Sequence, residues 1–221
     1  MVEERNTPAI ETLRADPSSR KAFLRSLGGG AAAASLTLAL AACGQKKAGG
    51  NQIGGAGVAT AAYGQGDAGI VNFALALEYL EADFYKQAVQ SGNLDGRALE
   101  LAKRFGDQEN SHVTTLEGTV RNLGGQPAPR PKASFTLDNR QTILATMDQL
   151  EGIGAGAYLG QADRIQSKEV LAAALSIHSV EARHAAVASM MLGRPISPDG
   201  PFARPLTSVD VLSQIRPFVT A

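Results

Sequence analysis

The sequence is poor in the residue types that most often carry redox or nucleophilic chemistry. It has one cysteine, three histidines and no tryptophan, and aromatic residues make up 5% of the chain. A single cysteine forms no disulfide within the chain and builds no thiolate cage for a metal ion. The scarcity of aromatic residues, beside abundant alanine and leucine, favours packed helices over a β-sandwich. We therefore expect an all-α fold in which any metal ion is held by glutamate, aspartate and histidine.

An excess of charge is also missing. Lys plus Arg and Asp plus Glu each total 21, so the formal net charge is zero. A chain without a basic surplus has no bulk field that attracts nucleic acid or an anionic membrane surface. The 221 residues, 44% of them hydrophobic, fit one globular domain of ordinary core size plus some unstructured length. We expect a single domain and no nucleic-acid partner.

The first 43 residues have the layout of an export signal. Basic residues at Arg20, Lys21 and Arg25 precede a run of alanine, glycine and leucine that ends at Cys43. The run is too short and too rich in small residues for a transmembrane helix, which needs about 20 strongly apolar residues. We interpret residues 1–43 as a signal peptide that is removed.

The residues around Cys43 suggest how the mature protein is held at the membrane. Residues 40–43, Leu-Ala-Ala-Cys, resemble a bacterial lipobox, in which the cysteine is lipidated and becomes the new N-terminus. The alternative is an incidental free thiol. The segment around Arg20 resembles a twin-arginine (Tat) signal with lysine in place of the second arginine, so the general secretory route also stays open. We expect an extracytoplasmic lipoprotein, on the periplasmic or cell-surface side, anchored by its lipid.

Hydrophobic periodicity predicts four helices after a tether. Residues 44–66 are rich in glycine and alanine with few large apolar side chains, which is typical of a flexible tether. Four helical patterns follow, the first of them capped by Asp67 and the last by Ser167. The expected helices cover residues 67–90, 97–122, 138–165 and 168–192. Turn-forming residues separate them within each pair, which predicts two helical hairpins.

The link between the two hairpins is expected to be a long crossover. Residues 126–132 contain three prolines and must be extended. The connection over residues 124–137 reaches ~45 Å at ~3.3 Å per residue, which exceeds the ~36 Å length of a 24-residue helix. It can therefore cross the full length of an up-down four-helix bundle spanning residues 67–192. Residues 193–221 are proline-rich with a short helix over 207–215, and we interpret them as a strap that packs on the bundle.

The two hairpins repeat one pattern of chemical groups. Each holds a glutamate, a tyrosine seven residues later, and a Glu-x-x-His pair on the next helix. The separations between the glutamates are 31 and 30 residues, and the members of each pair lie at similar distances from their hairpin loop, so they can meet across the bundle. The pattern comprises Glu78, Tyr85, Glu109 and His112, and then Glu151, Tyr158, Glu181 and His184.

This pattern predicts a site for two metal ions. Residues three apart on a helix share a face, so each Glu-x-x-His pair can ligate from one side. Four carboxylates and two imidazoles form the inward-facing ligand set of di-iron and di-manganese bundles. The expected ligands are Glu78, Glu109, His112, Glu151, Glu181 and His184. One Glu-x-x-His alone is usually a solvated helical pair, but two of them at matching hairpin positions are hard to explain in that way.

Several residues near these ligands have weaker assignments. Tyr85 and Tyr158 are candidates for hydrogen bonds to the ligand carboxylates, with ordinary core tyrosines as the alternative. Glu81 shares nearly the same face as Glu78 and is either an additional carboxylate or a supporting one. His178 and Asp148 stay outside the ligand set. Glycines 152, 156 and 160 lie inside a helical pattern, where each costs ~1 kcal/mol relative to alanine, so we expect a close backbone approach or a local bulge there.

These segments resemble a known family. Residues 77–85, 150–160 and 180–185 are similar to the ferritin-like proteins of the plant desiccation-related and fungal stress-response type, over about residues 67–192. The resemblance implies an up-down four-helix bundle with a buried di-metal centre, usually taken to be iron. It also implies that Glu109 and Glu181 bridge the two ions, that Glu78 and Glu151 are terminal ligands, and that His112 and His184 each bind one ion.

Three functions follow as expectations. The first is Fe(II) oxidation by O₂ or hydrogen peroxide at a two-iron centre, a ferroxidase reaction that protects against oxidative or desiccation stress; hard carboxylate ligands suit Fe(III). The second keeps the ligands but loads manganese, or mixed iron and manganese, and disproportionates peroxide. The third is a non-enzymatic protective or scaffold lipoprotein. The expected partners are the metal ions, O₂ or peroxide and the membrane lipid, and a homodimer stays open.

Overall fold

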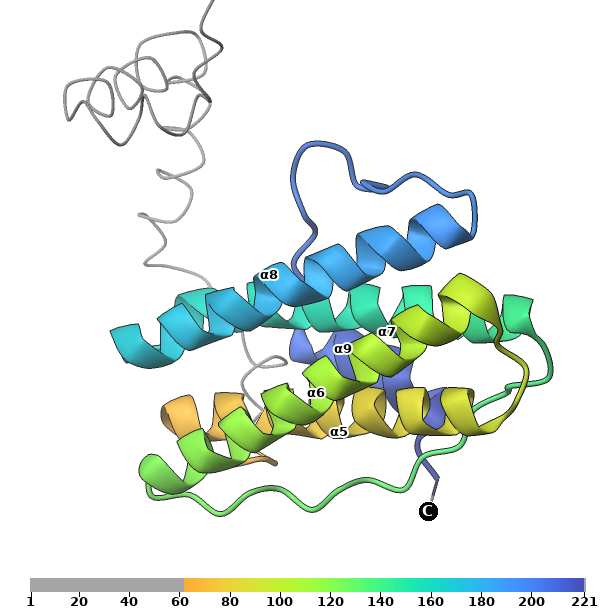
Figure 1. Cartoon of the computed structure of the whole chain (residues 1–221). Helices are drawn as coiled ribbons and strands as arrows, with labels where there is room; N and C mark the ends of the chain where they lie inside the picture. Colours follow the sequence, from red (N-terminus) through yellow and green to blue (C-terminus); the bar gives the residue numbers. More distant parts are fainter. Residues whose placement is uncertain (1–61, 221) are drawn as a thin grey trace, which may run out of the picture. The chain divides into compact units, whose positions relative to one another are not determined.

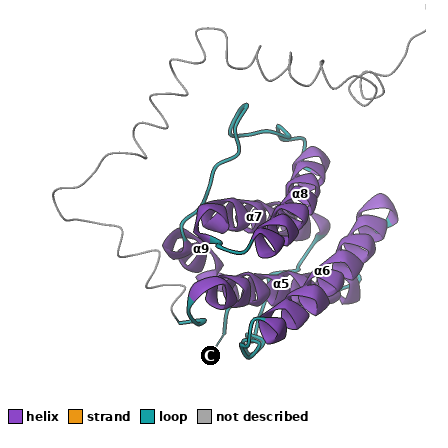
Figure 2. Cartoon of the chain, turned by 90° about the vertical axis from the view of Figure 1, so that its left-hand side faces the viewer, coloured by secondary structure: helices purple, strands orange, loops and turns teal. Residues whose placement is uncertain are grey.

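The computed structural model describes residues 62–220. Four long helices form the bundle: α5 (Gly66–Gln90), α6 (Gly96–Asn122), α7 (Arg140–Gln161) and α8 (Lys168–Met191). Figures 1 and 2 show α5 beside α6 and α7 beside α8, as two antiparallel hairpins. The all-α class and the four-helix bundle made of two hairpins are confirmed. None of the helices within residues 62–220 combines the length and the apolar character that crossing a membrane requires.

The long crossover runs along α5. The segment between α6 and α7 follows the length of the bundle in Figure 1. The side chain of Asn72, near the start of α5, accepts a hydrogen bond of 2.8 Å from the backbone of Ala128, and Asn93, beyond its end, donates one of 2.7 Å to the carbonyl of Leu137. These bonds hold both ends of an extended segment whose prolines exclude a helix. The crossover is therefore extended over the full bundle length, as the sequence predicts.

Of the two predicted helix caps, one is confirmed and one is wrong. Ser167 caps α8 by accepting a hydrogen bond from the backbone of Val170, and Asn139 caps α7. The expected cap at Asp67 is wrong, because α5 begins without a side-chain cap. The Asp67 carboxylate instead accepts bonds of 2.9 and 2.7 Å from the backbone N–H groups of Gln166 and Ser167. Its short side chain therefore links the start of α5 to the loop before α8 and joins the two hairpins.

The C-terminal segment packs on α7. It contains α9 (Ser208–Ile215), capped by Thr207, and a 3-10 turn, η2 (Arg216–Phe218). Val211 of α9 is fully buried, and α9 lies against α7. The strand-like end of the chain bonds to the crossover, with 2.9 Å between the nitrogen of Ser134 and the carbonyl oxygen of Phe218. The segment thus fastens the second hairpin and the crossover together.

Of the α7 glycines at positions 152, 156 and 160, two allow the C-terminal segment to approach the helix. The carbonyl of Gly156 accepts a bond of 2.9 Å from the backbone N–H of Leu206. A β-carbon at Gly160 would lie 1.9 Å from the carbonyl oxygen of Leu206, whereas one at Gly152 would meet no atom within 4 Å. The expected close approach is therefore present at Gly156 and Gly160, and α7 continues through all three glycines as a regular helix.

We predict opposite effects of alanine at two of these glycines. Gly160→Ala should lower the free energy of unfolding by ~1–3 kcal/mol, because the new methyl group must displace the backbone at Leu206. Gly152→Ala, in open space on the same helix, should raise it by up to ~1 kcal/mol through helix propensity. Urea unfolding of both variants tests this. Equal effects of the two substitutions would show that the close contact with Leu206 does not constrain the fold.

Candidate metal centre

Each of the four bundle helices contributes to one buried polar cluster. Glu78 comes from α5, Glu109 and His112 from α6, Glu151 from α7, and Glu181 and His184 from α8. On α6 and α8 these residues separate two apolar core clusters, one toward each end of the bundle. The four glutamates are 0% exposed and His184 is 3% exposed. The fold therefore brings all six predicted ligand residues to one level in the middle of the bundle.

The six residues form two groups that share two members. Glu78, Glu109, His112 and Glu181 each offer a ligand atom within 4.8 Å of the others. Glu109, Glu151, Glu181 and His184 form a second group of the same kind. Because Glu109 and Glu181 belong to both groups, each has a carboxylate between two neighbouring positions. The bridging role that the family resemblance implies for these two residues stays a prediction.

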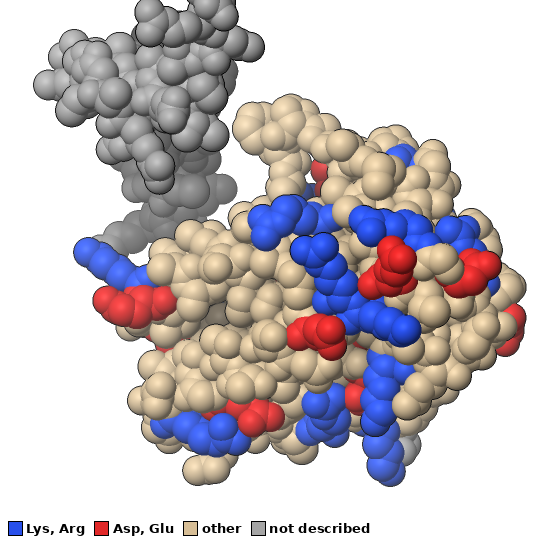
Figure 3. Space-filling model, in the orientation of Figure 1, with Lys and Arg blue, Asp and Glu red and all other residues tan. Residues whose placement is uncertain are grey.

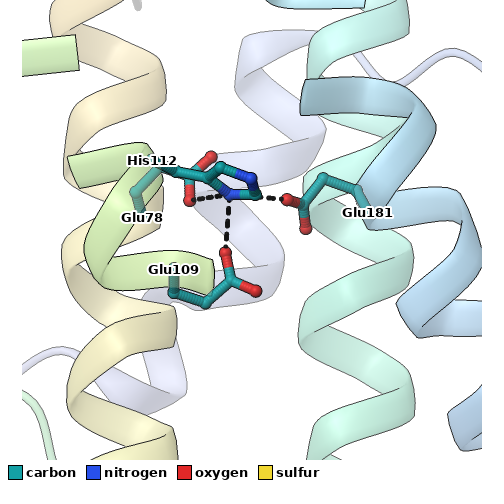
Figure 4. Close-up of side chains that lie close together, drawn as sticks. All are labelled: Glu78, Glu109, His112 and Glu181. Carbon is teal, nitrogen blue, oxygen red and sulfur yellow. Dashed lines mark hydrogen bonds and ion pairs between the residues drawn. The ribbon is translucent and has the colours of Figure 1, made fainter. Parts of the chain in front are cut away.

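Three carboxylates converge on His112. Figure 4 shows its ring reaching toward Glu78, Glu109 and Glu181, which come from three different helices. The Nδ1 atom lies 3.1 Å from Glu78 Oε2, 2.9 Å from Glu109 Oε2 and 3.2 Å from Glu181 Oε1. One N–H group cannot serve three acceptors well. The convergence of donor atoms is the arrangement that a cation between them would need.

The second imidazole faces the same carboxylates from the other side. His184 Nδ1 lies 3.0 Å from Glu109 Oε1 and 3.2 Å from Glu151 Oε2, in directions unsuited to a hydrogen bond. Its Nε2 lies 2.7 Å from Gln108 Oε1, and the Phe105 ring stacks on the imidazole at 3.8 Å. Since a carbonyl oxygen only accepts, Nε2 donates to Gln108, and Nδ1 is the ring atom that faces the carboxylates. The amide thus orients the imidazole so that Nδ1 could bind a cation.

Unpartnered buried atoms show that the cluster fits a pair of metal ions. Among the described residues, several of the converging atoms are buried and make no hydrogen bond: Glu109 Oε1, Glu151 Oε2, both Glu181 oxygens and His184 Nδ1. Such atoms are costly unless something binds them. Two divalent cations would balance the four carboxylate charges. Six oxygen and nitrogen donors of this kind suit iron or manganese, and the set itself does not select between them.

In the metal-free cluster, the surroundings shift the pKa values of the glutamates in opposite directions. Burial, followed by repulsion from neighbouring glutamates, raises the pKa of Glu78, Glu151 and Glu181 well above the ordinary value. Burial would lower the pKa of His112, but hydrogen bonds to glutamates outweigh it and raise that pKa to about 12. Burial would likewise raise the pKa of Glu109, yet the two histidines lower it to about 2. Without cations, the cluster must therefore take up protons.

The two tyrosines bond to carboxylates across the bundle. Tyr85 of α5 donates a short hydrogen bond to Glu151 Oε1 of α7, and Tyr158 of α7 donates one of 2.5 Å to Glu78 Oε1 of α5. Each tyrosine therefore fixes the glutamate of the other hairpin rather than the one on its own helix. In both glutamates the bond occupies the oxygen that does not approach a histidine, which leaves the other oxygen free to bind a cation.

Glu81 lies at the edge of the cluster, opposite a glycine. It is 3% exposed, and its Oε2 has no hydrogen-bond partner. A β-carbon at Gly154 would lie 2.8 Å from Glu81 Oε1 and 3.2 Å from Glu181 Oε2. Gly154 thus provides the space that lets two carboxylates lie against the backbone of α7. Glu81 belongs to neither group of four, so the structure places this carboxylate beside the candidate ligands and not among them.

The remaining candidates from the sequence lie outside the cluster. His178 Nδ1 lies 3.0 Å from the carbonyl oxygen of Ala155 on α7. Asp148 accepts a bond of 2.5 Å from the hydroxyl of Ser189 and one of 2.6 Å from Arg194. These contacts join α7 to α8 and to the segment that follows it. Cys43 and the lipobox lie outside the described residues.

A comparison with protein families agrees with this geometry. The sequence model of the ferritin-like domain family matches residues 66–194 of this chain. The chain belongs to the ferritin-like family. No match was found among curated proteins. The matched range of the ferritin-like domain includes all four bundle helices and both groups of candidate ligands.

Sequence reasoning missed the partners of His184 in the ferritin-like domain. Gln108 and Phe105 precede Glu109 on α6, but the equivalent positions before Glu181 hold Val180 and Ile177. A search for repeated chemistry therefore passes over them. The sequence signal for Gln108 is a polar residue one position from a ligand, on a helix face that is otherwise buried. Polar residues at such positions are common on helices, so the signal carries little information without the structure.

We predict that the metal-stripped ferritin-like domain becomes less stable as the pH rises from about 5 to about 9. The glutamates whose pKa is raised hold protons in the folded state that the unfolded chain releases, so unfolding becomes easier as the pH rises above 4.5. The raised pKa of His112 acts in the same direction, since its contribution is lost between 6.5 and about 12. The lowered pKa of Glu109 matters only below 4.5. Thermal unfolding at several pH values measures the slope.

Two variants separate the cluster from the rest of the charges. Glu181→Gln should flatten this slope, because it removes a buried carboxyl. Glu100→Gln changes a glutamate whose side chain is 71% exposed and should leave the slope as it is. A metal-stripped protein whose melting temperature stays constant or rises between pH 5 and pH 9 would contradict the conclusion that the buried glutamates make stability depend on pH.

Proposed function

We propose that this protein binds two metal ions at the bundle centre and oxidises Fe(II) with O₂ or hydrogen peroxide. The observation that carries the proposal is the pair of four-residue groups that share Glu109 and Glu181. Glu78 and His112 would complete one position, and Glu151 and His184 the other. Iron is the metal that the family resemblance implies, and the ligand set is compatible with it: hard carboxylates suit Fe(III), and the imidazoles would hold Fe(II) beforehand.

The protein's own residues would contribute three things to this reaction. Tyr85 and Tyr158 orient the two unshared glutamates through their hydrogen bonds. Gln108 orients His184 so that Nδ1 faces the carboxylates. His112, whose side chain is 12% exposed, is the most accessible of the six, so cations would enter beside it. In the reaction, two Fe(II) give two electrons to O₂, which takes up two protons to leave hydrogen peroxide.

The physiological setting rests on the sequence alone. We propose that the protein is exported, lipidated at Cys43 and held outside the cytoplasm, where it removes Fe(II) and oxidant together during oxidative or desiccation stress. The support is the order of basic segment, apolar run and lipobox, and the resemblance to stress-related ferritin-like proteins.

We predict that purified protein holds close to two metal ions per chain and that the shared glutamates are needed for this. Elemental analysis should find iron or manganese in the wild type, and a Glu109→Gln, Glu181→Gln double variant should lose most of it. Fe(II) oxidation in the presence of O₂ should be faster with wild type than without protein, and should fall to background in the double variant. A Glu100→Gln, Glu169→Gln variant, changed at two exposed positions, is the matched control.

The metal that is found decides between the alternatives. Two manganese ions with oxygen release from peroxide would replace the ferroxidase proposal by peroxide disproportionation. Bound metal with oxidation at background would leave a protective or scaffold protein whose metal serves stability. No bound metal after anaerobic loading with Fe(II) or Mn(II) would overturn both enzymatic functions.

We predict that a Cys43→Ala variant expressed in a bacterial host stays unlipidated. Wild type should partition into the detergent phase and carry the mass of a diacylglyceryl-modified N-terminal cysteine, and the variant should do neither. Mass spectrometry of the membrane fraction measures this. A wild-type protein that retains residues 1–42, or that is cleaved without added lipid, would refute lipid anchoring.

A further inference from the structure

An apolar cavity of about 30 Å³ lies at one end of the bundle, away from the hairpin loop between α5 and α6. All four bundle helices contribute to its wall. Apolar side chains make up most of the lining, among them Ile70, Val71, Leu77, Leu116, Val170 and Ala174. The wall also includes Thr119, Tyr158 and Gln161.

The cavity begins where the two hairpins separate. α6 and α8 meet at few positions, in contrast to the helices within each hairpin. Thr119 of α6 and Ala173 of α8 are half-buried and line the outer part of the cavity. Figure 3 shows uncharged surface between the left-hand parts of these two helices, with charged side chains gathered at the left-hand end of each. An uncharged molecule therefore has an uncharged approach between two charged margins.

The inner wall reaches the metal-ligand cluster. Leu77 lines the cavity and directly precedes Glu78. Tyr158 also lines it and donates its hydroxyl to Glu78 Oε1 at 2.5 Å. One side chain therefore separates the cavity from a candidate ligand.

The size and polarity of the cavity select a small apolar occupant. A water-sized probe needs ~10–15 Å³, so the space admits about two heavy atoms. A buried water needs two to four polar partners. The Thr119 hydroxyl donates to Thr115 and that of Tyr158 to Glu78, so both offer a water only their lone pairs, and Gln161 Nε2 is the wall donor without a partner. The rest of the wall is apolar, so a diatomic gas fits the space, and a water at Gln161 is the occupant that it must displace.

We propose that this cavity binds dioxygen on its way to the metal-ligand cluster. This rests on the proposed function and deepens it, because it makes O₂ the oxidant that enters through the apolar end. Each O₂ that arrives takes two electrons from two Fe(II) and two protons, and leaves as hydrogen peroxide. Peroxide is polar and enters poorly by this route, so its access would be beside the more exposed His112.

The occupant can be tested without turnover. Crystals of the protein under xenon pressure should show one xenon atom between Leu116, Val170 and Ala174. Ala174→Leu fills the space and should abolish the xenon density, and Ala74→Leu, on α5, should do the same from another helix. Ala172→Leu places the same side chain at an exposed position of α8 and should leave the density unchanged. Absence of xenon in the wild type would overturn the proposal.

Kinetics then connect the cavity to the reaction. The filled variants should have a kcat/KM for O₂ in Fe(II) oxidation lower by roughly threefold or more, because a close-packed interior leaves the gas no other space until side chains move. Their oxidation of Fe(II) by hydrogen peroxide under anaerobic conditions should equal that of the wild type. Equal losses with both oxidants, or no loss with O₂, would refute the route. Xenon binding in a wild type that oxidises no Fe(II) would refute the proposed function and leave the gas site established.

Discussion

The burial of four glutamates at one level of the bundle is the constraint on which the rest of the structure depends. Like charges in an apolar interior repel one another, and the raised pKa values of Glu78, Glu151 and Glu181 express that cost. The neighbouring structure lowers it in a few specific ways. Two histidines face the carboxylates, two tyrosines donate to them, and Gly154 leaves room for them beside α7. A ferritin-like bundle without cations would retain this cost in every folded molecule.

The same glutamates explain how two loosely joined hairpins become one domain. α6 and α8 touch at few positions, yet they carry Glu109 and Glu181, the residues common to both ligand groups. A pair of cations held by these carboxylates would tie the hairpins together where their own packing is weakest. The protein adds two links that need no metal: Asp67 binds the loop before α8, and the C-terminal segment bonds to both α7 and the crossover. Metal binding at this position would therefore be coupled to hairpin assembly.

The sequence predicts the parts of this design that repeat and misses the parts that do not. Two matched sets of glutamate, tyrosine and Glu-x-x-His predict the hairpins and the residues of the cluster, because helical spacing fixes which side chains share a face. Asp67 was expected to cap its own helix, since a local hydrogen bond is the simplest use of a carboxylate there. Its actual partners are about 100 residues away, and only tertiary packing brings them near. The support that Gln108 gives to His184 is invisible for the same reason.

The departures from the repeat make the two groups of candidate ligands unequal. Glu81 on α5 corresponds to Gly154 on α7, since each lies three residues after the hairpin's first glutamate, and these two residues face one another in the fold. A carboxylate at both positions would crowd the cluster, and a glycine at both would leave it without the additional acid. In the metal-free cluster, burial and then repulsion from Glu181 raise the pKa of Glu81. His184 is enclosed by Phe105 and Gln108, while His112 lies nearer to solvent. A symmetric pair of hairpins thus builds an asymmetric cluster, in which one imidazole is enclosed and the other is more accessible to solvent.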